Sequence, residues 1–209
     1  MEAVLDLYEE EADPRRPRVN FDEQSYQMLE EVREPLPAKG ARPLRYDYQY
    51  RRKGTCNLFL FFCLDSGWRE VKVTPQRTAA DFAHCMKDLV DLHFPDAEVV
   101  RVILDNLNTH TPASLYEAFA PAEARRILKR LEFHFTPKHG SWLNMAEIEL
   151  SVLTRQCLDR RLPDLESVAR ETTAWVKDRN AQGATVQWRF TAPQARDKLQ
   201  RLYPSSSVW

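Results

Sequence analysis

Three acidic side chains of this sequence are candidates to bind a divalent cation together: Asp22, Asp105 and one of the pair Glu147 and Glu149. Asp105 stands where the apolar run VVRVIL ends in DNLNTH, which places more polar side chains at a strand end than a simple turn requires. Mg²⁺ prefers an octahedral shell of oxygen ligands and usually takes one or two carboxylates, leaving positions for water and a substrate phosphate. Two such ions about 4 Å apart can activate an attacking oxygen and stabilise a leaving oxygen at phosphorus. The acids therefore predict chemistry on a phosphodiester.

The third acid is ambiguous. Glu147 and Glu149 are two residues apart on a predicted helix, so they point roughly 200° apart and cannot serve one site together. Glu147 lies in the first helical turn, which favours it. Each acid also has an ordinary explanation: Asp22 as an exposed strand-end acid, Asp105 as a turn residue, and Glu147 as part of a helix cap with Asn144. Because the chain has 31 acidic residues, three of them alone are weak evidence.

The composition is that of a globular protein of one domain. Of the 209 residues, 43% are apolar and 29% are charged, and the longest apolar runs, such as NLFLFFCL, are too short to span a bilayer. The net charge of −1 means that a nucleic-acid partner is expected to be held by local patches, by metal ions or by a segment that this chain lacks. The acidic N-terminus does not resemble a signal peptide. Four scattered cysteines without a C-x-x-C pair argue against a zinc site and predict reduced, mostly buried thiols in a cytoplasmic protein.

The hydrophobic pattern predicts five strands and several helices that must position these acids. Three strands come first, and strands then alternate with helices, which predicts a mixed five-stranded sheet with helices on both faces. Ligand sites in such sheets collect beyond the carboxyl ends of strands, where Asp105 falls. Residues 1–12 predict only a short amphipathic turn, followed by a Pro-Arg linker. The predicted strands are residues 19–25, 57–64, 68–74, 99–104 and 131–137, and the main helices begin at residues 78, 112, 145 and 163.

Residues 33–53 differ in composition from the rest of the chain. Seven Lys or Arg residues face two acids there, and three prolines and three tyrosines are interleaved with them. The prolines exclude a helix or a central strand. Two interpretations stay open: a solvated loop, or a basic, aromatic arm that touches phosphates or a second subunit. The candidate DNA-binding residues in this segment are Arg42, Arg45, Arg51, Arg52 and Lys53.

Three segments together resemble the catalytic domain of insertion-sequence transposases of the mariner-like superfamily from bacteria. They are FDE at 21–23, VILDNLNTH at 102–110 and TPKHGSWLNMAEIELSVL at 136–153. The similarity runs from about Phe21 to Tyr203 and includes QCLDRRLPD and VQWRFT. It implies a ribonuclease H-like α/β fold and places the family's catalytic DDE triad, which binds the metal, on Asp22, Asp105 and Glu147. Because the last two are 42 positions apart, a longer spacing than the superfamily commonly has, Glu149 is kept as the fallback.

The resemblance also implies an activity and partners. The expected enzyme is a Mg²⁺-dependent transposase with two divalent ions, for which Mn²⁺ can substitute. It hydrolyses DNA at the transposon ends, and the freed 3′-hydroxyl then attacks target DNA at a TA step. A homodimer on DNA is expected, with the basic arm of residues 33–53 reaching the second subunit. His110, Lys138 and His139 flank the acids and are candidates to contact phosphates.

Full-length relatives carry a helix-turn-helix domain ahead of the catalytic domain. Only a short linker precedes the first predicted strand here, so we expect a separate polypeptide to supply that domain, or a truncated or split gene. The predicted organisation is a linker at 1–18, the catalytic domain at 19–203 and a tail at 204–209. Two alternatives stay open: a ribonuclease H-like nuclease with another role, and an inactive domesticated remnant that binds DNA or a partner.

Overall fold

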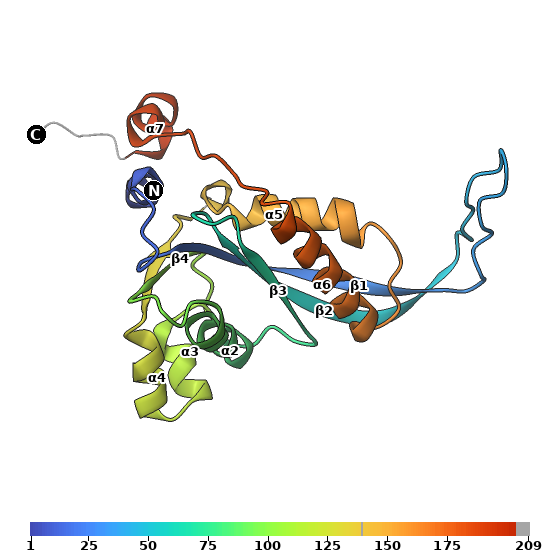
Figure 1. Cartoon of the computed structure of the whole chain (residues 1–209), viewed down its shortest axis with the longest axis horizontal. Helices are drawn as coiled ribbons and strands as arrows, with labels where there is room; N and C mark the ends of the chain where they lie inside the picture. Colours follow the sequence, from blue (N-terminus) through green and yellow to red (C-terminus); the bar gives the residue numbers. More distant parts are fainter. Residues whose placement is uncertain (139, 204–209) are drawn as a thin grey trace, which may run out of the picture.

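Five strands form one mixed sheet in the order β3-β2-β1-β4-β5 (Figure 1). In this computed structural model, which describes residues 1–138 and 140–203, β1 runs antiparallel to β2 and parallel to β4. β3 is antiparallel to β2, and β5 is parallel to β4. The fold class predicted from the sequence is confirmed. The strands are β1 (Arg18–Glu31), β2 (Tyr50–Cys63), β3 (Arg69–Thr74), β4 (Val100–Leu104) and β5 (Leu131–Phe135).

Helices cover both faces of the sheet (Figure 1). One face packs against α2 (Ala79–Asp88), its π-helical extension Leu89–His93, α3 (Pro112–Ala118) and α4 (Pro121–Leu128). The other face packs against α5 (Ala146–Leu153), a π-helical turn at Thr154–Leu158 and α6 (Leu165–Ala181). A capping box formed by Thr78 and Asp81 starts α2, the helix predicted to begin at residue 78. Among the described residues, no helix combines the length and apolar character needed to cross a membrane.

The period-2 alternation of β1 distributes its side chains between the two cores. Val19 and Phe21 lie in the core on the α2 side of the sheet. Asn20 is fully buried on the α5 side, where its carbonyl oxygen accepts a hydrogen bond from the Met145 N–H. Asp22 and Glu23 follow on opposite faces by the same alternation. β1 therefore offers one carboxylate to each face of the sheet near the point where β4 ends.

The N-terminal segment differs from the prediction of a short turn and a linker. Residues Glu2–Glu9 form α1, a two-turn helix whose Leu5 is fully buried in the α5-side core. The Tyr8 hydroxyl donates to the Leu143 carbonyl oxygen at 2.7 Å. At the other end of the chain, α7 (Ala192–Lys198) lies beside α1, and Arg196 forms an ion pair with Glu2. The difference arises because contacts with residues more than 130 positions away stabilise this helix, and periodicity over eight residues cannot reveal such contacts.

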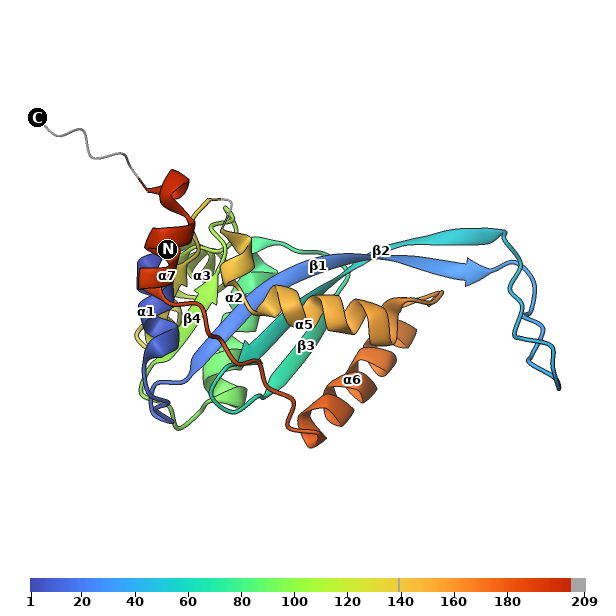
Figure 2. The same ribbon diagram turned by 90° about the horizontal axis from the view of Figure 1, so that it is seen from above.

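The first two strands are longer than predicted and form an arm that projects from the body (Figures 1 and 2). The outer part of the arm is the pairing of β1 with the start of β2, and residues 32–49 connect the two strands at its tip. Arg161 supports the outer part of the arm, since its guanidinium donates to the Gln49 carbonyl oxygen at 3.1 Å. The prolines do keep residues 33–49 out of regular strands, but the prediction was wrong for residues 50–53, which belong to β2.

Candidate active site

Asp22 and Asp105 come from neighbouring parallel strands. Asn20 of β1 pairs with Ile103 of β4, and continuing this register by two residues brings Asp22 level with Asp105. The two acids therefore meet beyond the carboxyl end of β4, the position that ligand sites favour in open α/β sheets. Asp105 is the first residue after β4, and its side chain remains 35% exposed.

Glu147 reaches this edge of the sheet from the first turn of α5, and its side chain is exposed. Two buried asparagines fix the start of that helix against β1. The Asn144 amide donates to the Phe21 carbonyl oxygen at 2.8 Å, directly before Asp22 in the chain. The Met145 N–H donates to Asn20 Oδ1 at 3.1 Å. These bonds tie α5 to the strand that carries Asp22, which explains how a residue 125 positions away is brought to the same edge.

Glu149 faces the opposite way. Its carboxylate is almost completely buried, with Oε2 3.0 Å from Arg69 Nε and Oε1 2.9 Å from Arg179 Nη2. Arg69 belongs to β3 and Arg179 to α6, so these ion pairs hold α5 against both elements. Glu149 is committed to this internal network, and of the two glutamates only Glu147 is turned toward solvent.

The electrostatics of Asp22 report how close the acids are. Burial raises the pKa of Asp22, and the negative charges of Asp105, Glu23 and Glu147 raise it further, to about 7. The Glu23 N–H, which donates to Asp22 Oδ1 at 2.8 Å, opposes this shift only in part. A carboxyl group whose pKa is raised by neighbouring carboxylates stands in an acidic site that a cation would stabilise.

His110 connects Asp105 to the other face of the sheet. Its ring is fully buried, with Nδ1 2.6 Å from Asp105 Oδ1 and Nε2 2.9 Å from Glu23 Oε2. The second approach is an ion-pair contact without the alignment of a hydrogen bond. Burial lowers the pKa of His110, but the carboxylates of Asp105 and Glu23 outweigh it and raise the pKa to about 9. At neutral pH the ring is therefore protonated, and Nδ1–H donates to Asp105.

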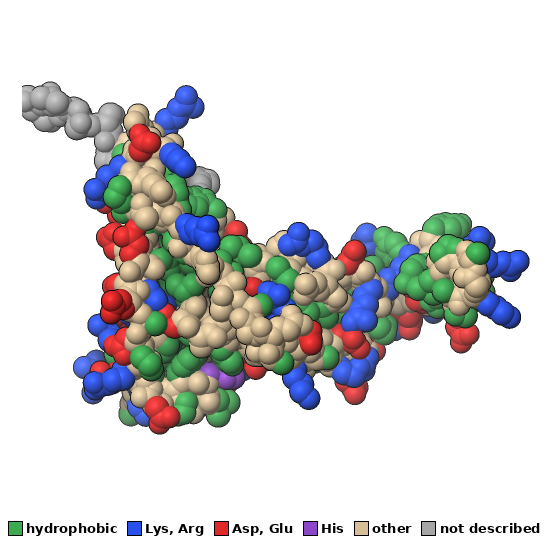
Figure 3. Space-filling view, turned by 45° about the horizontal axis from the view of Figure 1, so that its top comes forward, with side chains coloured by type: hydrophobic (Ala, Val, Ile, Leu, Met, Phe, Trp, Pro, Cys, Tyr) green, Lys and Arg blue, Asp and Glu red, His purple; other side chains and the backbone are tan. Residues whose placement is uncertain are grey.

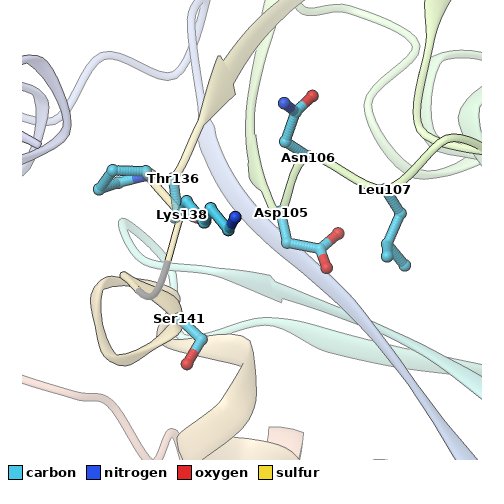
Figure 4. A pocket seen from close by; sticks show the side chains of 7 residues that line it. Asp105, Asn106, Leu107, Thr136, Lys138 and Ser141 are labelled. Carbon is cyan, nitrogen blue, oxygen red and sulfur yellow. The ribbon is translucent and has the colours of Figure 1, made fainter.

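A cavity of about 370 Å³ opens beside Asp105, between the ends of β4 and β5 (Figure 4). Asp105 and Lys138 reach toward it from the two strand ends, and Ser141 lines it from the side of α5. Glu147 lines a separate hollow of about 360 Å³ with Trp142 and Arg155. In the described part of the chain, no three His, Cys, Asp or Glu side chains converge into a ready set of metal ligands. The acids are neighbours, but Asp105 is turned onto His110.

The predicted phosphate-binding residues fall into different groups. The prediction that His110 contacts a phosphate is corrected, because a fully buried ring that faces two carboxylates cannot reach DNA in this conformation. Lys138 is exposed at the cavity, and His139 lies outside the described residues. The five basic candidates are all exposed, either in the tip segment 32–49 or at the outer start of β2. They belong to the arm, which projects away from the body of the protein (Figures 1 and 3). Of the described candidates, Lys138 is therefore exposed beside Asp105, and the basic residues of the arm form a separate, distant group.

Sequence reasoning missed three residues that build this edge: Asn20, Glu23 and Asn144. Asn144 was considered only as part of a helix cap, and Glu23 stood unnoticed beside Asp22. Their partners lie far along the chain, 87 positions from Glu23 to His110 and 123 from Phe21 to Asn144. The one local signal available was Asn20, a polar residue between the apolar Val19 and Phe21, because buried polar groups need partners.

Solved structures share this arrangement of sheet and helices. The crystal structure of the Mos1 mariner paired-end complex with Mn superposes with a TM-score of 0.55 at 16% sequence identity, over 87% of this chain and 55% of the Mos1 chain. The Mos1 strand transfer complex gives 0.53 at 16% identity, over 87% and 54%. The fold is therefore similar to the ribonuclease H-like α/β fold of the Mos1 transposase. The chain spans little more than half the length of the Mos1 protein.

The sequence identifies the family. Residues 17–169 match the family of DDE superfamily endonucleases, and the chain belongs to it. The matched region includes Asp22, Asp105 and Glu147. A search among curated proteins found no significant match. The protein is thus a nuclease-type enzyme by family, and the resemblance inferred from the three sequence segments is confirmed at that level.

Proposed function

We propose that this chain is the catalytic domain of a DNA transposase, which cleaves DNA at transposon ends and joins them to target DNA. Its membership of the DDE endonuclease family and its Mos1-like fold support this proposal. The observation that carries it is the meeting of Asp22, within β1, and Asp105, at the end of the neighbouring strand β4, with the charge of Glu147 close enough to raise the pKa of Asp22. An acidic group of this kind at a sheet edge suits phosphodiester chemistry.

The chemistry of the donor set fits Mg²⁺, or Mn²⁺ in its place. The site offers oxygen ligands from carboxylates, and Cys ligands are absent because all four cysteines are buried and none is among the acids. Asp22 and Asp105 would hold the ions, and Glu147 would complete the site from α5. Bound divalent ions would supply activation of the attacking oxygen and stabilisation of the leaving oxygen. The solved Mos1 complex that contains Mn is consistent with this choice.

The residues of the chain supply position and charge. Asp22 and Asp105 are held on adjacent strands of the sheet, which fixes the spacing of their backbones. Glu147 sits at a helix start that Asn144 ties to β1, and there it can orient the attacking hydroxyl or water. Lys138, exposed at the cavity beside Asp105, is placed to contact a phosphate of the DNA. Pre-positioned groups of this kind lower the barrier by orientation.

The arm is proposed to contact DNA or a second subunit bound to the other DNA end. Apolar side chains are exposed on it beside the basic ones, including Tyr48 at 84% and Leu36 at 65% exposure (Figure 3). Large exposed apolar groups on a projecting element are typical of a protein interface. The dimer on DNA, the TA target and the delivery of the domain to transposon ends, by a helix-turn-helix segment or a separate polypeptide, belong to the same proposal.

Nicking of supercoiled plasmid DNA in Mg²⁺ or Mn²⁺ tests this function. We expect the unmodified chain to nick, and the variants Asp22→Asn, Asp105→Asn and Glu147→Gln each to lose at least 100-fold in rate, because removal of a metal carboxylate or of the orienting acid removes transition-state stabilisation. Joining of a pre-cut 3′ end to plasmid DNA then separates a transposase from a nuclease of another role. Nicking that persists in all three variants would contradict the proposed site.

A further inference from the structure

His110 is enclosed on every side by residues of the α2-side core and by two carboxylates. Its ring packs edge-on against Phe21, with centroids 5.4 Å apart, and is tilted against Phe82 at 4.9 Å. The backbone N–H of His110 donates to the Leu107 carbonyl oxygen at 3.0 Å, and this hydrogen bond closes the loop after β4. Two aromatic rings and a closed loop leave the imidazole little freedom to rotate, so its two nitrogens have fixed directions.

Asp105 is less restrained than its neighbour Asp22. It lies one residue beyond Leu104, where β4 ends, and its side chain is 35% exposed. The 2.6 Å hydrogen bond from His110 Nδ1 holds one carboxylate oxygen, Oδ1. Among the described residues, none donates a hydrogen bond to the other oxygen, Oδ2. The imidazole thus determines the orientation of this carboxylate and leaves Oδ2 free for a ligand.

Glu23 contacts the other nitrogen of His110 on the α2 side of the sheet. Its side chain is 3% exposed, and Oε2 lies 2.9 Å from His110 Nε2. Arg77 lies 3.7 Å from the other carboxylate oxygen, Oε1. Asp22 and Glu23 are consecutive on β1. This strand therefore carries both the acid that lies beside Asp105 and the acid that contacts His110.

We propose that His110 is a positioning residue, which orients the Asp105 carboxylate for metal binding and is itself held by Glu23. This inference rests on the proposed function, since it takes Asp105 to be a metal ligand. Hydrogen-bond partners behind a metal ligand commonly contribute 10- to 100-fold to metal affinity. A ring that merely fills the core would contribute to stability alone.

Two substitutions separate orientation from packing. In His110→Asn the amide nitrogen can take the place of Nδ1 and still donate to Asp105. In His110→Gln the longer side chain places its amide nitrogen near Nε2, so the donor to Asp105 is lost. Both remove the ring from between Phe21 and Phe82, so a purely structural role predicts similar losses of stability and similar metal affinity.

The affinity of the whole chain for Mn²⁺ is measured without DNA, with the electron paramagnetic resonance signal of free Mn²⁺ as the readout. Melting temperatures in metal-free buffer report the stability of each variant. We expect His110→Asn to stay within about threefold of the unmodified chain, and His110→Gln to weaken Mn²⁺ binding by about 10- to 100-fold. Equal affinities in the two variants, whether both kept or both lost, would overturn the inference. If the substitutions at His110 prevent folding, Glu23→Gln replaces them: a weaker affinity for Mn²⁺ supports the inference and an unchanged affinity overturns it.

Asp105→Asn distinguishes this inference from the proposed function. If Asp105→Asn leaves Mn²⁺ affinity unchanged, Asp105 is not a ligand and the proposed site fails whatever His110 does. If Asp105→Asn weakens binding but His110→Gln does not, the site stands and the positioning role alone is wrong.

Discussion

Glu149 Oε2 lies 3.0 Å from Arg69 Nε in the interior of the protein, whereas Glu147, two residues earlier on the same helix, is exposed. The ion pair fixes the rotation of α5 about its own axis. With Glu149 held between β3 and α6, Glu147 can only point toward the edge of the sheet. Of these two glutamates, Glu149 thus supports the interior of the protein and Glu147 occupies the candidate catalytic position.

Exchanging each glutamate for glutamine tests this division. Glu149→Gln leaves Arg69 buried without its carboxylate, and breaking a buried ion pair costs about 3–5 kcal/mol. We expect a fall in melting temperature of roughly 10 °C, by the scaling for a chain of this size. Glu147→Gln, at an exposed position, should change stability by less than about 0.5 kcal/mol yet abolish nicking. A stable but inactive Glu149→Gln beside an active Glu147→Gln would reverse the assignment.

The sheet could be predicted from local signals, and the site only in part. Apolar runs and alternation located all five strands, and the Asp65-Ser66-Gly67 turn joins the two strands predicted at 57–64 and 68–74, with Gly67 at a φ of +69°. That Asp22 lies beside Asp105 depends on β1 pairing with β4, a contact across some 80 residues that no local pattern specifies. It was the similarity to a transposase family that assigned Asp22 and Asp105 to one site. His110 was misread because nothing in DNLNTH shows that Glu23 lies beneath the loop.

The pKa of Asp22 predicts how stability depends on pH. Its folded-state pKa is raised from 3.8 to about 7, so the folded protein holds the proton more tightly than the unfolded chain does. The stability associated with this proton is present below about pH 4 and is lost as pH rises to about 7. We expect Asp22→Asn to melt higher than the unmodified chain at about pH 8 in metal-free buffer.

That difference should shrink toward zero as the pH approaches 4, because the carboxyl group is then protonated in both states. Excess Mn²⁺ should reverse the order at pH 8, since bound metal stabilises the unmodified chain by mass action. Calorimetry at several pH values measures both effects. A difference that is the same at every pH would show that Asp22 does not carry the raised pKa.

The role of α1 is tested by substitution of Leu5, which is fully buried in the α5-side core. Leu5→Ala should cost about 2–5 kcal/mol and lower the melting temperature by roughly 5–15 °C. The matched control is Asp6→Ala, on the exposed side of the same helix, which should have little effect. If residues 1–18 were only a linker, both variants would melt like the unmodified chain.

The arm is tested by its contribution to DNA affinity. Arg42→Ala combined with Arg45→Ala removes two exposed cations near the tip. If each contacts a phosphate, the slope of log affinity against log salt concentration should fall by about 2 in magnitude, at roughly 0.9 per contact. Arg125→Ala with Lys129→Ala, two exposed cations at α4, is the charge-matched control. Equal changes in the two double variants would show a general charge effect and no specific contact by the arm.

The position of a bound metal ion tests the central claim most directly. Crystals of this chain soaked in Mn²⁺ give an anomalous signal that locates the ion without reference to activity. We predict a peak within about 2.2 Å of a carboxylate oxygen of both Asp22 and Asp105, since Mn²⁺ binds such oxygens at close to the Mg²⁺ distance. Asp105 should keep its hydrogen bond to His110 on the other oxygen. A chain that binds Mn²⁺ only at other residues, with no peak between Asp22 and Asp105, would contradict the account.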